Sequence, residues 1–419
     1  MEDYFAFESG VTSQGLRVYV KHVEVPRPQV VAGLMAFAGF RQSPQDGISH
    51  ALEHAVAAAD GVMPMILGKQ RFAREHRLVI EDFGETNTET VFWRVRSAPE
   101  QFGDALRFLH GMARVMPTEF SLDGLKEVLQ REFVEMRNPD REKIDRIPHS
   151  ALVPDTHPML SASLETPETI AALTKERLLE HWQRYYTLPN MTLVVAGSVT
   201  LADAIAAAEV AFSAMSHDAG ATRDEVQPII AQQVRSGELV VSMEDVLGDK
   251  HRLQRDPLMR LFRVLPARTF HCQQNDFVMN VINGVCFRVL REERKILYGV
   301  NIGMMSYRDL DYYEVEAMFG MERREECAST LRHLPELVKE HGRKEFEMQK
   351  CGAVTKLALS DYSLRELQKG SLMEVGDFGR ILTHAEQLRV LEEITFDDVV
   401  RCVEELFSPD KSLFVTILP

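Results

Sequence analysis

Strand-like and helix-like patterns alternate along the first half of the chain. Four stretches rich in β-branched and apolar residues predict strands, at 16–20, 30–37, 91–95 and 192–196. Apolar positions with helical spacing predict helices over about 47–59, 100–115, 121–137, 168–186 and 201–215. The mixture predicts an α+β fold.

The second half repeats part of this order in register. Thr174 opens a predicted helix and a strand follows around Thr192, while Thr395 opens a helix and a strand follows around Ser412. Thr395 follows Thr174 by 221 positions, and Ser412 follows Thr192 by 220. Both openings suit an N-cap with acidic residues in the first turn. The shared register indicates a duplicated domain, although helix-then-strand units also occur in α+β proteins without duplication.

A weakly periodic stretch separates the two halves. Residues 216–233 contain Gly220, Thr222 and Pro228, which predict a linker. We therefore expect an N-terminal domain over 1–215 and a C-terminal domain over 234–419. A chain of 419 residues is long enough for two or more domains.

Composition narrows the classes of function. A 45% hydrophobic and 26% charged chain is typical of a globular protein, and its net charge of −15 argues against nucleic acid as a partner. The excess of acidic residues indicates a surface that keeps the protein soluble, in preference to a site that selects basic peptides. The N-terminal residues do not resemble a signal or transit peptide, and no apolar run reaches the ~20 residues that span a bilayer. The five cysteines form no CxxC pair, which favours reduced thiols. We expect a cytoplasmic protein without a membrane partner.

The segment His50-Ala51-Leu52-Glu53-His54 is the strongest candidate for chemistry. On a helix, His50, Glu53 and His54 fall within about one quadrant, so two imidazoles can bind one Zn²⁺ while Glu53 faces the open position. This H-x-x-E-H order is the inverzincin pattern. It would arise by chance in such a chain with a probability of roughly 5%. The alternative is a pair of surface histidines beside a solvated glutamate.

A third ligand is expected from the helix predicted over 121–137. Its apolar residues form one stripe, and Glu132 falls inside that stripe, whereas Glu127 and Glu135 lie elsewhere; the stripe comprises Leu122, Leu125, Leu129, Phe133 and Met136. A buried carboxylate is costly unless it is paired or binds a metal. Glu132 is therefore a metal-ligand candidate, with a salt bridge to an arginine as the alternative.

With these candidate ligands the chain resembles the M16, or pitrilysin-like, metallopeptidases. Ala36–Arg41 and Gly47–Ser49 resemble the family's approach to its H-x-x-E-H helix. The family's third ligand is a glutamate some seventy-odd residues further on, and Glu132 follows His54 by 78 positions. The resemblance implies one Zn²⁺ per chain held by His50, His54 and Glu132, with Glu53 as the catalytic base.

Two further elements extend the resemblance. Gly84–Thr88 resembles the family's substrate-contact segment, which implies that Asn87 contacts the peptide backbone. Arg291 and Tyr298, seven positions apart, resemble the family's Arg/Tyr element and are implied to hold the substrate near the metal as catalytic and substrate-binding residues. Without the resemblance they would be interpreted as a helix arginine with its charge in solvent and a strand tyrosine.

The sequence also departs from the family pattern. Leu125 stands where many members carry an acidic residue, and Gly84 alone remains of the paired glycines. Thr88 replaces a common alanine, and Lys295-Ile296 stand where a glycine is expected before Tyr298. These changes leave the expected metal ligands intact and concern substrate preference and turnover.

The resemblance implies two homologous α/β-sandwich domains, each a sheet with helices packed on one face, in an M16-like half-shell. It implies a zinc metalloendopeptidase that binds extended peptides by strand addition in a closed cleft. Because the chain resembles half of the four-domain enzymes, we expect a homodimer or a heterodimer with another M16-like chain. One alternative is a non-catalytic or partner-dependent subunit of a heterodimeric peptidase. Another is a metal hydrolase with a non-peptide substrate.

Overall fold

Two compact units make up the chain in the computed structural model, which describes residues 6–43, 47–57, 64–114, 120–136, 139–154, 157–161, 166–213, 215, 236–248, 257–358 and 363–419. The first unit contains Met1–Arg137, Thr156–Glu225 and Asp361–Thr383. The second contains Asn138–Asp155, Val226–Ser360 and His384–Pro419. The division into domains 1–215 and 234–419 stays a prediction, and the expected linker at 216–233 lies outside the described residues.

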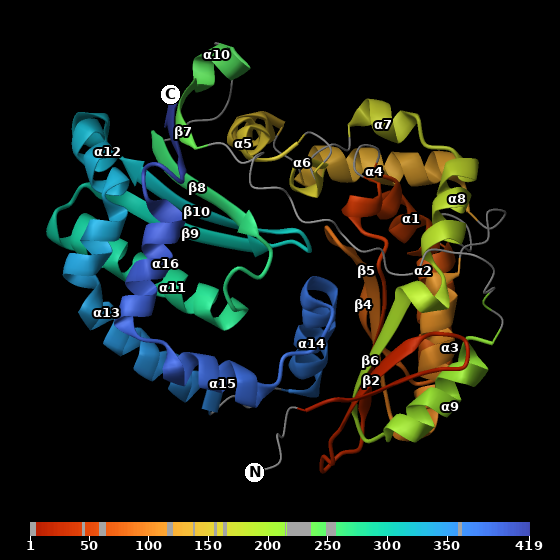
Figure 1. The fold of residues 1–419 in the computed structure, drawn as a ribbon. Helices are drawn as coiled ribbons and strands as arrows, with labels where there is room; N and C mark the ends of the chain where they lie inside the picture. The colour runs from red at the N-terminus through yellow and green to blue at the C-terminus, as the bar shows by residue number, and fades with distance from the viewer. Residues whose placement is uncertain are drawn as a thin grey trace. The chain divides into compact units, whose positions relative to one another are not determined.

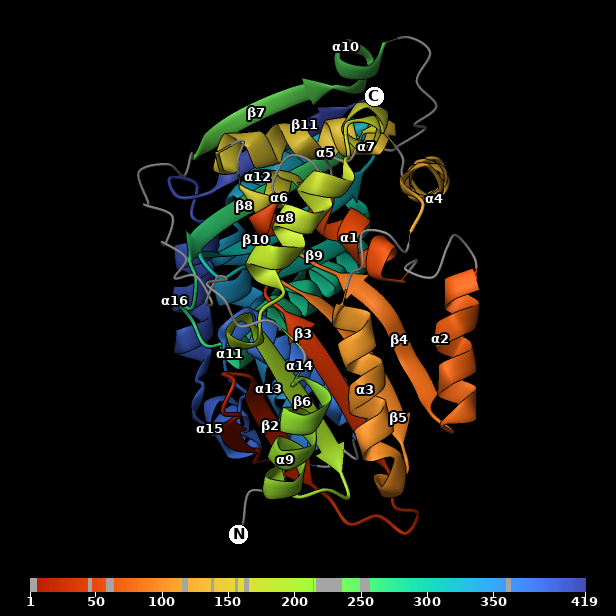
Figure 2. The ribbon, with the colours of Figure 1, turned by 90° about the vertical axis from the view of Figure 1, so that its right-hand side faces the viewer.

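The first unit is built on a six-stranded sheet with the order β1-β2-β6-β3-β5-β4. β2 and β6 are parallel, and the other neighbours are antiparallel. β4 lies at the edge and pairs irregularly with β5 (Figure 2). The strands are β1 (Glu8–Val11), β2 (Arg17–His22), β3 (Val30–Ala36), β4 (Val79–Thr86), β5 (Val91–Ser97) and β6 (Met191–Gly197).

Helices cover both faces of this sheet (Figure 1). Alternate residues of β3 point to opposite faces, so Leu34 joins the larger core under α3 and α9, while Met35 joins a smaller core under α14. The helices of the unit are α1 (Ile48–Ala57), α2 (Pro64–Glu75), α3 (Phe102–Ala113), α4 (Leu122–Met136), α6 (Pro158–Ser161), α7 (Pro167–Ala171), α8 (Lys175–Tyr185), α9 (Leu201–Ala211) and α14 (Leu364–Phe378).

The second unit repeats the strand pairing of the first. Its sheet has the order β7-β11-β8-β10-β9, with β7 and β11 parallel and the other neighbours antiparallel. This is the pairing of β2-β6-β3-β5-β4, so the predicted α+β fold with a duplicated sheet is confirmed. The strands are β7 (Gly237–Ser242), β8 (Leu258–Pro266), β9 (Leu297–Ser306), β10 (Leu310–Phe319) and β11 (Leu413–Leu418).

One face of the second sheet carries the larger core, formed with α11, α13 and α16. On the other face, Arg260 of β8 donates a hydrogen bond to Asp145 of α5 at 2.7 Å. The helices of the unit are α5 (Pro139–Leu152), α10 (Met243–Leu247), α11 (Cys272–Val285), the π-helix η5 (Cys286–Glu293), α12 (Arg324–Arg332), α13 (Leu334–Ala358), α15 (His384–Glu393) and α16 (Phe396–Phe407).

Helix caps explain the main difference from the predicted elements. The stretch 168–186 forms two helices, α7 and α8, because the Thr174 hydroxyl accepts a hydrogen bond from the Arg177 N–H at 3.3 Å and starts a new helix. The predicted cap at Thr395 is also present, in a capping box with Asp398.

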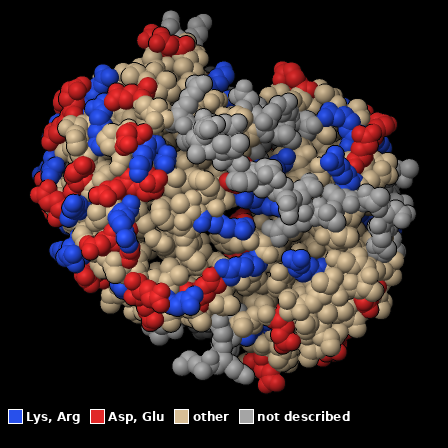
Figure 3. Space-filling view, in the orientation of Figure 1, with Lys and Arg blue, Asp and Glu red and all other residues tan. Residues whose placement is uncertain are grey.

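Charged side chains of both signs lie intermixed on the face shown in Figure 3. The excess of acidic residues therefore forms no continuous acidic surface among the residues drawn there. None of the helices in the described part of the chain is both long and apolar enough to cross a membrane. All five cysteines lie in described segments and are free thiols.

Candidate functional site

Helix α1 has one buried face and one face that carries ionisable groups. His50, Glu53 and His54 are partly exposed, as expected from their helical spacing. The opposite face is buried in the core of the first unit through Ile48, Ala51, Leu52, Ala55 and Val56. Packing of this apolar face fixes the side from which the two imidazoles project.

A buried polar network anchors the start of α1. The Ser49 hydroxyl donates to the Gly39 carbonyl at 2.8 Å, and the Ser49 N–H donates to Ser43 Oγ at 3.1 Å. Nε2 of His181, on α8, lies 3.3 Å from Ser49 Oγ. Burial lowers the pKa of His181 to about 4, so its ring is neutral at pH 7. The network thus ties α1 to the neighbouring helix α8 without a buried charge.

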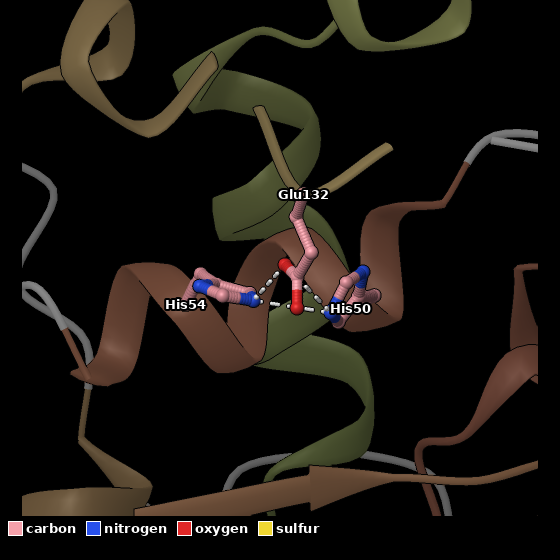
Figure 4. A group of neighbouring side chains, drawn as sticks. All are labelled: His50, His54 and Glu132. Carbon is pink, nitrogen blue, oxygen red and sulfur yellow. Dashed lines mark hydrogen bonds and ion pairs between the residues drawn. The ribbon is translucent and has the colours of Figure 1, made fainter. Parts of the chain in front are cut away.

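His50, His54 and Glu132 come together in the first unit (Figure 4). The two Nε2 atoms lie 3.0 Å apart. Glu132 Oε2 lies 3.0 Å from His54 Nε2 and 3.7 Å from His50 Nε2. Ligand atoms around a tetrahedral zinc with bonds of ~2.0–2.1 Å lie about 3.3–3.4 Å apart. The observed separations of 3.0, 3.0 and 3.7 Å lie on either side of this range, and the three side chains offer the chemistry of a His₂Glu ligand set.

Glu132 reaches this cluster from α4. Leu125 and Leu129 on the same helix are buried, with exposures of 2% and 3%. The Glu132 side chain is 31% exposed, whereas Glu127 and Glu135 are exposed. Leu125, where many M16 members carry an acid, is part of the hydrophobic core. Of the three glutamates, Glu132 is the one that α4 directs to the histidines.

Glu53 contacts the edge strand β4. Thr86 Oγ1 donates a hydrogen bond to Glu53 Oε2 at 2.6 Å. A Cβ added to Gly84 would lie 2.6 Å from Glu53 Oε1, so the strand backbone approaches the carboxylate closely. Neither contact was predicted from the sequence, although the period of two along a strand places Gly84 and Thr86 on one face.

Asn87 stabilises the turn between β4 and β5. Its Oδ1 accepts hydrogen bonds from the N–H groups of Glu89 and Thr90 at 3.0 and 2.7 Å. Its carbonyl oxygen accepts from the Phe40 N–H at 3.0 Å, and Arg41 binds Glu89 through two nitrogen atoms. The segment expected to contact substrate is therefore fixed to the residues that precede α1.

Arg291 and Tyr298 lie in the second unit. Arg291 is an exposed residue in the last turn of η5, and its guanidinium lies 4.9 Å from the centre of the Phe287 ring. Tyr298, on the edge strand β9, is 58% exposed. Between them, Lys295 has φ of 53°, a left-handed conformation that favours glycine. This is the place where the family pattern expects a glycine.

A comparison with protein families matches part of the chain. Residues 172–351 match the sequence profile described as Peptidase M16 inactive domain. The match covers this segment alone, and it supports the resemblance of the chain to the M16-like peptidases. The matched segment contains Arg291 and Tyr298 but lies after His50, His54 and Glu132, so the word "inactive" does not describe the segment with the histidines. None of the curated proteins matches the chain.

Solved structures share the fold over nearly the whole chain. A peptidase M16 inactive domain from Pseudomonas fluorescens is 16% identical with a TM-score of 0.79, covering 99% of this chain and 98% of that one. A protease from Helicobacter pylori is 15% identical with a TM-score of 0.79, covering 99% of each chain. The periplasmic protease PqqL from Escherichia coli is 15% identical with a TM-score of 0.76; all of this chain matches 48% of PqqL.

Proposed function

We propose that the chain is a zinc-dependent endopeptidase that hydrolyses peptides or unfolded segments bound in extended form. The convergence of His50, His54 and Glu132, with ligand atoms within 4.8 Å of one another, carries this proposal. Zinc, when bound, supplies a Lewis acid that polarises a carbonyl and makes water acidic near neutral pH. Glu53, on the same helix face, would accept the proton of the attacking water and deliver it to the leaving amine.

The edge strand β4 supports an extended substrate. It pairs with β5 on one side, and its residues are mostly half-buried. A peptide added along the open side would run past Glu53, which contacts this strand. Asn87, Arg291 and Tyr298 are proposed, from the family resemblance, to contact the substrate. Asn87 would use its amide N–H groups, since its Oδ1 is engaged in the turn.

A second copy of an M16-like domain pair is the proposed partner. The whole chain matches about half of PqqL, so a homodimer or a heterodimer would supply a similar number of domains. Size-exclusion chromatography with light scattering measures this directly. A non-catalytic or partner-dependent subunit is the second candidate function, because the profile that matches residues 172–351 is described as inactive.

Metal analysis and peptide cleavage test the proposal together. We expect about one zinc per wild-type chain and per Glu53→Gln chain, with cleavage of a quenched fluorescent peptide library by the wild type alone. Glu132→Gln should lower zinc affinity by more than the roughly 10–100-fold typical of residues that only support ligands. Glu127→Gln, on the same helix but exposed, is the matched control and should keep both zinc and activity.

The outcomes separate the two functions. Wild-type protein that binds zinc but cleaves no peptide would favour the non-catalytic or partner-dependent subunit. Equal cleavage by wild type and Glu53→Gln would exclude Glu53 as the base.

A further inference from the structure

The carboxylate of Glu53 is held by strand β4 as well as by its own helix. Glu53 Oε2 accepts a hydrogen bond from Thr86 Oγ1 at 2.6 Å. This is a short hydrogen bond to a carboxylate, in the range of charge-assisted bonds. The Thr86 hydroxyl occupies one lone pair of the carboxylate, so Glu53 keeps other lone pairs that can accept a proton.

Gly84 makes the contact between Glu53 and strand β4 sterically possible. A Cβ at this position would meet Glu53 Oε1 at 2.6 Å, Cγ at 2.7 Å and Cδ at 2.9 Å. Any side chain there would therefore displace Glu53 or the strand. The hydrogen bond to Thr86 and the close approach at Gly84 act on the same carboxylate from one face of β4.

The backbone of Thr86 is itself fixed. Thr86 pairs with Val91 at the end of the β4–β5 ladder, and the Asn87 N–H donates to the Thr90 carbonyl at 2.9 Å. On the neighbouring residue, Glu85 forms an ion pair with Lys369 of α14 at 3.0 Å. A β-branched side chain on such a backbone has few χ1 rotamers, so its hydroxyl is preorganised.

We propose that Thr86 is a positioning residue that orients the Glu53 carboxylate for proton transfer. The inference rests on the proposed peptidase function of Glu53. A general base must lie within hydrogen-bond reach of the proton it accepts, and small displacements reduce catalysis strongly. Thr86 acts through Glu53 and not on the metal ligands, so its removal affects turnover and not zinc binding.

Substitution of Thr86 tests this role against a structural one. Thr86→Val keeps the shape and removes the donor, and we expect kcat to fall roughly tenfold with KM and zinc content unchanged. Thr86→Ser keeps the hydroxyl and should restore most of kcat. Thr330→Val, which removes a threonine hydroxyl from α12 in the second unit, is the control and should behave as wild type.

A readout without catalysis separates this inference from the peptidase proposal. Crystal structures of the zinc-loaded wild type and Thr86→Val should show the Glu53 carboxylate in one orientation in the former and displaced or in several orientations in the latter. This comparison holds even if the wild type cleaves no peptide. A Thr86→Val protein with an unmoved Glu53, or with kcat equal to or above that of the wild type, overturns the proposal. The second result would mean that the hydrogen bond restrains Glu53 instead of preparing it.

Discussion

His181 shows how one buried residue couples the packing of helix α1 to pH. Its pKa is lowered to about 4, chiefly by burial, while a free histidine titrates near 6.5. A histidine with a lowered folded pKa contributes stability that is present above pH ~6.5 and is lost as pH falls towards ~4. His149, partly buried beside Tyr312 in the second unit, has the same shift for the same reason.

We therefore expect His181→Gln to make stability less sensitive to acid. Between pH 7.5 and pH 5 the wild type should lose about 2 kcal/mol through this residue, by linkage at ~1.4 kcal/mol per pH unit below 6.5. The variant should lose less over the same interval, with the contribution of His149 remaining. Urea unfolding at the two pH values measures both losses. Equal losses in wild type and variant would show that the pKa of His181 is the same in the folded protein as in the unfolded chain.

At the residue scale, the sequence predicts contacts within a helix better than contacts between elements. His50, Glu53 and His54 share a face because helical geometry alone requires it. Glu132 was predicted from its place in an apolar stripe and from its distance along the chain from His54, which resembles the spacing of the third ligand in the M16 family. Thr86 and His181 were missed, because their contacts to α1 join residues 33 and 132 positions apart and depend on tertiary packing.

At the element scale, α14 is built into the first sheet through a buried arginine. Arg94 of β5 is 1% exposed and donates hydrogen bonds to Asp82, to Gln368 and to the Arg365 carbonyl, each at 2.6 Å. Gln368 in turn donates to the Val194 carbonyl at 3.0 Å. A buried guanidinium is stable only when its donors are satisfied, so α14 is required by the sheet that it covers.

Gly33 of β3 makes room for this network, and its substitution tests the packing. A Cβ there would lie 2.3 Å from Gln368 Nε2 and 3.2 Å from Arg94 Cγ. We expect Gly33→Ala to destabilise the protein by about 1–3 kcal/mol through overpacking. Gly370→Ala, on an exposed position of α14 with open space around it, should stabilise by about 0.5–1 kcal/mol. Urea midpoints at unchanged m-value measure both changes. A Gly33→Ala protein as stable as wild type would mean that α14 docks with more freedom than its hydrogen bonds imply.

The distinction between contacts within an element and contacts between elements also explains which elements the sequence predicts. α3 and α16 have regular apolar stripes. Where the sequence predicted a boundary of these helices, the observed boundary lies within about two residues of it. β4 was not predicted, because Glu81, Asp82 and Glu85 interrupt its apolar pattern. Its acids are paired by Arg94, Arg365 and Lys369, and the last two lie on a helix 284 positions from the acids that they bind. Local propensity contains no information about such pairs.

At the scale of the whole molecule, each unit receives a helix from a distant part of the chain. α14 follows most of the second unit in sequence but belongs to the first, and α5 lies between two segments of the first but belongs to the second. Each covers the sheet face opposite the larger core, where Arg94 and Arg260 respectively are buried. Division at a single linker would therefore leave each half without the helix that satisfies its buried arginine.

A fragment that lacks α14 tests whether the first unit depends on this distant helix. A fragment of residues 1–225 should expose the apolar residues that α14 covers, including Met35, Phe92 and Val194, and should leave Arg94 without two of its acceptors. We expect it to bind a hydrophobic dye and to lack a cooperative thermal transition. Fusion of residues 361–383 through a flexible linker should restore that transition.

Leu372→Asp in the fused segment is the control, because it places a charge in the buried contact of α14 and should abolish the rescue. A fragment 1–225 that unfolds cooperatively at the same temperature with and without the fused helix would show that the first sheet is stable alone. The part of the first unit within residues 1–225 would then fold before the second half of the chain is made. If the rescue depends on α14, the candidate site on α1 can form only after residue 378 has been synthesised, because β4, which contacts Glu53, is paired to that helix.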